Sequence, residues 1–212
     1  MKLATIVLLG ILLLGSFASM QADDPVAASQ VAIAYTGTSV STSDTTGICM
    51  WHPLLVGDLD LTSLYATPLF GTPVPDKEHS YLIWVSDFSM QVLPPSKDFK
   101  DINFLALVST GSATIYYTDR PDLRDWRDWT NRSTWGEPVA RFIRRAGVFP
   151  SADNGYSGTL TSTAELVSSS TFTLNGKQFN FRNLIPHGMT CTEAGIGDAE
   201  VGTCVAVGVG WL

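Results

Sequence analysis

YLIWVSDF, residues 81–88, is a short apolar run of aromatic and β-branched residues that ends in polar ones. This composition is typical of a buried β-strand. Downstream, INFLALVS (102–109) and ATIYYTD (113–119) predict two further strands, which Thr110-Gly111-Ser112 would join as a hairpin. Working outward from this stretch, the sequence indicates a β protein.

FTLNGKQFNF, residues 172–181, predicts a second hairpin. Asn175 and Gly176 both tolerate positive φ, as a two-residue type I′ turn requires. With this turn Phe172 lies opposite Phe179, and such a cross-strand aromatic pair helps to fix the register. Further strands are predicted at 31–35, 159–169 and 201–212.

TWGEPVARFIRRAG, residues 134–147, fits two structures. Thr134 and Glu137 match a helix capping box, Gly147 could end the helix, and apolar residues recur at helical spacing. Alternating residues of the same segment would also share one face of a strand. We therefore expect an all-β, single-domain sandwich or barrel of about eight mostly antiparallel strands, with room for one short helix near 135–146.

Residues 1–22 have the order of a secretory signal peptide. Lys2 precedes an apolar run from Leu3 to Leu14, which is followed by small residues, and the run is too short to cross a bilayer. We expect cleavage near Asp23, a secreted protein (extracellular or periplasmic), and one β-rich domain over residues 23–212. No later stretch has the length of a membrane helix, so we expect no membrane span in the mature chain.

The net charge and the motifs that are missing from the sequence argue against several classes of function. A formal net charge of −7, about −8 once Lys2 is removed, argues against nucleic acid as a partner. No P-loop, dinucleotide fingerprint, H-E-x-x-H or EF-hand motif occurs, so we expect no cofactor and no metal.

Three cysteines leave the disulfide pairing open. Cys191 and Cys204 bracket a glycine-rich segment that could close as a disulfide loop in an oxidising compartment, leaving Cys49 unpaired. Cys49 could instead pair with either of them. A less favoured alternative is a zinc site made of Cys49, His52, His187 and Cys191.

PDLRDWRDWTNRSTWGEP, residues 121–138, concentrates arginine and tryptophan in a chain with few charges. Indole rings can stack on sugars while arginines bind hydroxyl groups. The same residues can form a structural clasp in which guanidinium groups stack on indoles, and we favour this interpretation. The ligand-binding hypothesis involves Trp126, Trp129, Trp135, Arg124 and Arg127.

The expected function is that of a secreted, non-enzymatic binding or surface protein, whose Trp/Arg-rich segment would contact a carbohydrate or another extracellular surface ligand. The alternative is a small secreted hydrolase that uses two carboxylates across a cleft, as glycosidases do. No spacing singles out a catalytic pair. The candidate acids are Asp58, Asp60, Asp87, Glu193, Asp198 and Glu200.

Overall fold

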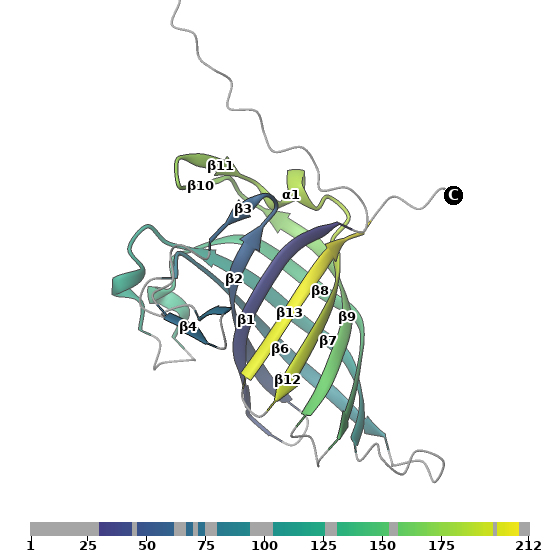
Figure 1. Cartoon of the computed structure of the whole chain (residues 1–212). Coiled ribbons are helices and arrows are strands. Elements are labelled where there is room, and N and C mark those ends of the chain that lie inside the picture. Colours follow the sequence, from purple (N-terminus) through teal and green to yellow (C-terminus); the bar gives the residue numbers. More distant parts are fainter. Residues whose placement is uncertain are drawn as a thin grey trace, which may run out of the picture.

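A closed antiparallel barrel of eight strands forms the body of the protein (Figure 1). The computed structural model describes residues 30–43, 46–61, 67–69, 72–74, 80–93, 104–125, 131–152, 157–196 and 199–207. The predicted signal peptide at 1–22 lies outside the described residues. Among the described residues, no helix is long and apolar enough to cross a membrane.

The barrel strands follow one another around the ring in chain order, and β1 closes it by pairing with both β2 and β13. They are β1 (Val31–Ser41), β2 (Thr46–Val56), β6 (Leu82–Leu93), β7 (Phe104–Tyr117), β8 (Glu137–Ala152), β9 (Ser157–Ser169), β12 (Met189–Ile196) and β13 (Ala199–Ala206). The shorter elements are β3 (Leu59–Asp60), β4 (Thr67–Leu69), β5 (Thr72–Val74), β10 (Phe172–Leu174), β11 (Lys177–Phe179), α1 (Phe181–Leu184) and two 3₁₀ turns at Pro121–Leu123 and Arg132–Thr134. The all-β prediction is confirmed, and of the two predicted architectures the barrel is the one observed.

The first four residues of strand β6 are all apolar because both faces of the strand are buried there. Leu82 and Trp84 belong to the main core, while Ile83 and Val85 belong to a second cluster completed by Trp135. Successive side chains of a strand point to opposite faces, so the segment after β7 must cover the outer face of β6. This explains why residues 81–88 show no polar alternation.

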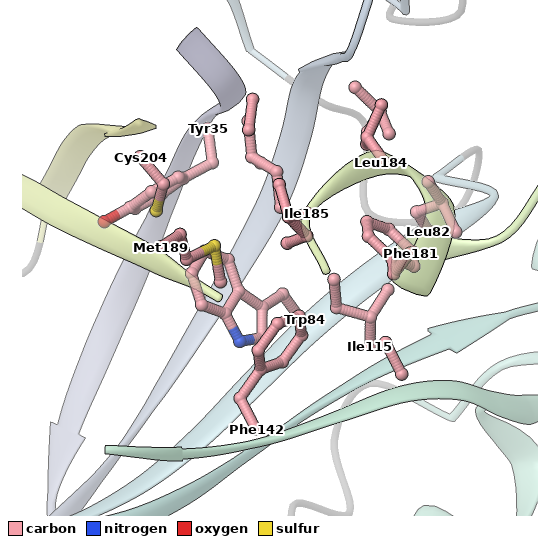
Figure 2. Close-up of a cluster of buried hydrophobic side chains, with 14 of the residues drawn as sticks. Tyr35, Leu82, Trp84, Ile115, Phe142, Phe181, Leu184, Ile185, Met189 and Cys204 are labelled. Atoms are coloured by element: carbon pink, nitrogen blue, oxygen red, sulfur yellow. The ribbon is translucent and has the colours of Figure 1, made fainter. Parts of the chain in front are cut away.

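A plug closes one end of the barrel. It consists of the β10–β11 hairpin and α1, which connect β9 to β12 and lie at the top of Figure 1. Phe172 stacks on Phe179 and on Phe181, and Leu184 and Ile185 pack into the same core (Figure 2). The predicted hairpin is confirmed: Asn175 and Gly176 have φ of 51° and 75°.

The predicted hairpin between residues 102–109 and 113–119 is wrong. Both segments, where described, belong to the single strand β7, which passes straight through Thr110-Gly111-Ser112. A Cβ on Gly111 would lie 2.1 Å from the carbonyl oxygen of Asp87 on β6. This glycine therefore permits a close approach of two strands and does not mark a turn.

The short helix considered for residues 135–146 is also wrong, because β8 occupies Glu137–Ala152 and pairs with β7 and β9. Buried and exposed residues alternate from Ala140 to Arg144, as in a strand, and Ile143 and Ala146 are exposed. The apolar residues at helical spacing therefore lie on both faces of β8 and do not form one helix face.

The Cys191–Cys204 disulfide, one of the predicted pairings, joins directly opposed residues of β12 and β13, and Cys49 is free and buried. Changing both Cys191 and Cys204 to serine is expected to lower the free energy of unfolding by about 3 kcal/mol, because the unfolded chain regains the conformational entropy that closing a loop of this length removes. The strands should stay paired, because their ladder runs from Met189 to Ile196.

Urea unfolding of the wild type and the double serine variant, followed by tryptophan fluorescence, measures this difference. The wild type in excess reductant serves as the control, since it should match the variant. A difference below about 1 kcal/mol between the variant and the oxidised protein would contradict the expectation.

Candidate functional site

Buried polar side chains line the barrel next to its apolar core. On β12, Glu193 lies four residues beyond the core residue Met189, and on β6 Ser86 lies four residues beyond Leu82. Even spacing keeps both members of each pair on the inner face. The buried polar residues of this region are Tyr35, Ser86, Arg144, Ser162, Glu193 and Glu200.

Tyr35 reaches Glu193 across a glycine. On β13, Gly202 is opposite Tyr35 on one side and opposite Glu193 on the other. A Cβ on Gly202 would lie 2.5 Å from the tyrosine ring. The absent side chain lets the ring lie over β13, where the Tyr35 hydroxyl donates a hydrogen bond of 2.9 Å to Oε2 of Glu193.

Trp51 reaches Glu200 in the same way. On β1, Gly37 is opposite Trp51 and opposite Glu200. A Cβ on Gly37 would lie 2.6 Å from Cδ1 of the indole. The indole therefore crosses β1, and its Nε1 donates a hydrogen bond of 2.7 Å to Oε2 of Glu200. Two buried carboxyl groups are thus each held by an aromatic side chain that crosses the intervening strand.

Burial raises the pKa values of three acidic groups in this region. It raises the pKa of Glu193 to about 8, with a further contribution from the charge of Glu200, while the Tyr35 hydrogen bond and Arg144 act in the opposite direction. Burial also raises the pKa values of Tyr35 and of the Cys49 thiol. Glu193 is therefore mainly protonated at neutral pH, while Tyr35 and Cys49 are neutral.

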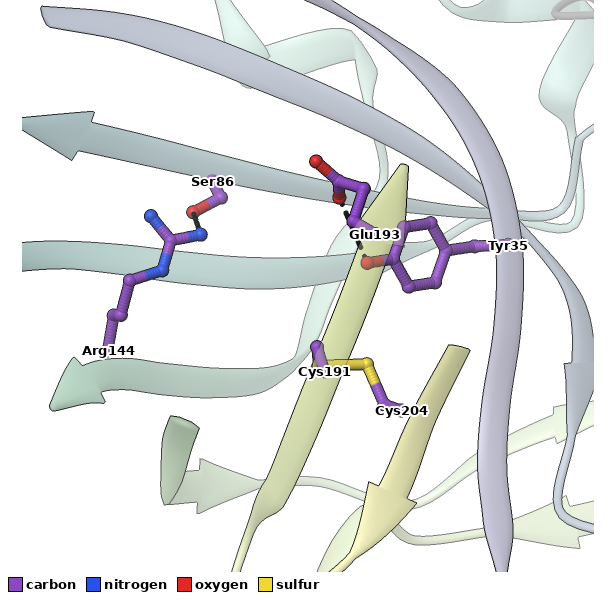
Figure 3. The surroundings of a disulfide bond; sticks show 6 residues. All are labelled: Tyr35, Ser86, Arg144, Cys191, Glu193 and Cys204. Carbon is purple, nitrogen blue, oxygen red and sulfur yellow. Dashed lines mark hydrogen bonds between the residues drawn. A yellow bond between two sulfur atoms is a disulfide. The ribbon is translucent and has the colours of Figure 1, made fainter. Parts of the chain in front are cut away.

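Arg144 is buried inside the barrel with only part of its hydrogen-bonding capacity used. Its side chain is 6% exposed, and its Nη2 donates a hydrogen bond of 3.1 Å to Oγ of Ser86 (Figure 3). Among the described residues, neither Arg144 Nη1 nor Nε1 of the buried Trp84 has a hydrogen-bond partner. Native proteins rarely leave such donors unsatisfied, so each requires an explanation.

Arg144, Trp84 and Glu193 line the same interior cavity, together with Tyr35, Trp51 and Ser162. The space open to the centre of a water molecule is about 10 Å³, which is room for roughly one water-sized group. Because the two unsatisfied groups are both donors, the cavity is complementary to a small hydrogen-bond acceptor, and the guanidinium charge favours an anionic one.

The structure separates the predicted Trp/Arg-rich segment into two parts. Trp126, Arg127 and Trp129 lie outside the described residues, so the carbohydrate-binding hypothesis for them stays a prediction. Trp135 is fully buried against the outer face of the barrel, and Arg132 lies over its ring at 5.6 Å. Arg124 is also buried and donates hydrogen bonds to backbone carbonyl groups.

The described candidate carboxylates divide between the surface of the protein and the barrel interior. Asp58 is exposed and binds Nζ of Lys177 at 2.7 Å, which lowers the pKa of Asp58. Asp87 binds Arg132 at 2.7 Å, and Asp198 lies outside the described residues. Glu193 and Glu200 belong to the paired strands β12 and β13. The disulfide also removes Cys191 from the alternative zinc set.

Sequence reasoning did not assign Tyr35, Trp84 or Arg144 to a site. The sequence did contain a signal for the two glutamates. A disulfide that joins Cys191 and Cys204 directly across two strands requires both cysteines to lie on the same face of the sheet. By alternation, Glu193 and Glu200 then lie on that same face. Comparison of the chain with protein-family models, curated proteins and solved structures finds no match in any of the three.

Proposed function

We propose that the protein is a non-enzymatic binding protein that holds a small monovalent anion inside its barrel. The observation that carries this proposal is the guanidinium group of Arg144, which is buried and charged and has Nη1 unsatisfied among the described residues. Leaving a buried donor unsatisfied costs about 1–3 kcal/mol, and more when the donor is charged. A bound anion removes this cost and balances part of the charge.

Trp84 strengthens the proposal because its side chain lines the same cavity and its indole Nε1 lacks a partner among the described residues. A guanidinium and an indole N–H together can bind two lone pairs of one carboxylate. Eight-stranded barrels have interiors that side chains nearly fill or that hold one small ligand. The cavity volume of about 10 Å³ limits the enclosed group to the size of a chloride ion or one end of a formate.

We also propose that the protein is secreted. The order of charged, apolar and small residues in 1–22 supports this proposal. The disulfide between β12 and β13 agrees with folding in an oxidising compartment.

Formate is expected to shift the indole ring resonances of Trp84 in a saturable way at pH 6. Titration followed by ¹H–¹³C spectra, with the resonances assigned through Trp84→Phe, measures the Kd. Arg144→Met should weaken binding at least about tenfold, because a hydrogen bond to a charged group contributes about 1.5–3 kcal/mol.

Arg141→Met is the matched control, since Arg141 lies on the same strand but is exposed. It should leave the Kd for formate unchanged, and thermal unfolding checks that both variants are folded. If neither formate, acetate nor chloride shifts the Trp84 resonances at about 100 mM, or if the two arginine variants bind alike, the cavity is not an anion site.

A further inference from the structure

We infer that anion binding in this cavity is coupled to a proton on Glu193, so that the protein holds its anion at neutral pH and releases it in alkaline conditions. This inference rests on the proposed function, because it describes regulation of the same site. It goes further in naming Glu193 as the group that competes with the ligand for the charge of Arg144.

One cation and one carboxyl group line the same cavity but do not form an ion pair with each other. Arg144 extends from β8 and Glu193 from β12, and both line the cavity (Figure 3). The hydrogen bond of Arg144 goes to Ser86, and that of Glu193 comes from Tyr35. Among the described residues, no ion pair links the guanidinium to the carboxyl group, so the charge of Arg144 is available to a ligand.

Charged and titratable groups face Glu193 from several strands. Glu200 on β13 disfavours a second negative charge, whereas Tyr35 on β1 and Arg144 on β8 favour it. Burial, followed by the charges of Glu200 and Glu193, raises the pKa of the Cys49 thiol on β2, so the thiol stays protonated. With Tyr35 also neutral, Glu193 is the group lining the cavity whose charge changes at mildly alkaline pH, since its pKa is about 8.

The direction of the coupling follows from charge. With Glu193 protonated, Arg144 is the one charged side chain among the described residues that line the cavity, and it attracts an incoming anion. With Glu193 ionised, a carboxylate already balances the guanidinium and repels the anion. Binding an anion to the ionised form therefore requires uptake of one proton by Glu193. By linkage, the affinity should fall by up to about tenfold per pH unit above pH 8.

The test is the Kd for formate at pH 6, 7, 8 and 9, read from the non-exchanging indole ring resonances of Trp84. We expect a constant Kd between pH 6 and 7 and about a tenfold weaker one at pH 9. Glu193→Gln should bind formate with the same Kd from pH 6 to pH 9, because the amide cannot ionise. Glu165→Gln, a change at an exposed residue on β9 that pairs with Arg145, should keep the wild-type pH dependence.

A second measurement on the wild type avoids any variant that folds poorly. Saturating formate added to the unbuffered protein at pH 8 should take up about half a proton per chain, and none at pH 6. Formate binding with equal affinity at pH 6 and 9 and without proton uptake would overturn the coupling and leave the anion site standing. Absence of formate binding at pH 6 would instead overturn the proposed function, and the coupling with it.

Discussion

Replacing Arg124 with methionine is expected to lower the free energy of unfolding by about 3–5 kcal/mol. This guanidinium group is 6% exposed and connects three backbone carbonyl groups. Its Nε donates to the carbonyl oxygen of Trp135 at 3.0 Å, Nη2 donates to that of Tyr81 at 3.0 Å, and Nη1 donates to that of Ser80. Methionine fills a similar volume but leaves all three acceptors without this donor.

The loss should be large because Arg124 joins the segment after β7 to the start of β6. The same segment carries Trp135, which is fully buried against Met50, Ile83 and Val85 and meets the ring of Tyr116 edge to face at 5.8 Å. Releasing the segment would expose this cluster to water. Since native domains have only about 5–15 kcal/mol of stability, the variant should unfold at a much lower urea concentration.

Arg120→Met provides the control, because Arg120 is 60% exposed and pairs with Asp122 at the surface. Exposed ion pairs contribute about 0–1 kcal/mol, so this variant should resemble the wild type. Urea unfolding monitored by tryptophan fluorescence gives both values. Equal losses for the two arginine variants would mean that residues 124–135 do not act as a structural clasp.

The parts of the fold that local rules determine could be predicted from the sequence. The type I′ turn at Asn175-Gly176 needs only two residues that tolerate positive φ, and the register of Phe172 and Phe179 follows from it. The strand within residues 159–169 could be predicted in the same way, since buried and exposed residues alternate along most of its length. Strand number and class follow from such local signals.

Features that depend on contacts between distant strands could not be predicted. Gly111 looks like a turn residue, yet its role is to let the carbonyl oxygen of Asp87 approach from β6. The apolar residues of β8 recur at helical spacing, although Val139 and Phe142 are buried while Ile143 and Ala146 lie on the exposed face of the strand. Arg144 alternates with the buried Ala140 and Phe142 on β8, so it lies inside the barrel although it is charged. Its partner across the cavity, Glu193, lies 49 positions later on β12.

The second large effect concerns Glu193. Changing Glu193 to glutamine is expected to raise the free energy of unfolding above that of the wild type. This advantage should be on the order of 4 kcal/mol larger at pH 8 than at pH 5. The folded-state pKa of about 8 lies above the ordinary value of 4.5. Between these values the folded wild type binds more protons than the unfolded chain, so its stability falls as the pH rises, by about 1.4 kcal/mol per pH unit.

Glutamine removes this loss because it stays neutral in both states and can still accept the hydrogen bond of Tyr35. Below pH 4.5, Glu193 is protonated in the folded state and mostly protonated in the unfolded chain, so the variant and the wild type should differ little. Above pH 8 the difference should stop growing. Other groups titrate equally in both proteins, so their contributions cancel when the two unfolding curves are compared at each pH.

Urea unfolding at pH 5, 6, 7 and 8 measures the difference, with Glu165→Gln as the control for loss of an exposed carboxylate, since Glu165 is 53% exposed. The difference in free energy of unfolding between this control and the wild type should not increase with pH. A Glu193→Gln variant whose advantage is the same at pH 5 and pH 8 would mean that Glu193 ionises in the folded barrel as it does in water. The carboxyl group would then be unable to act as the proton-dependent competitor of a bound anion.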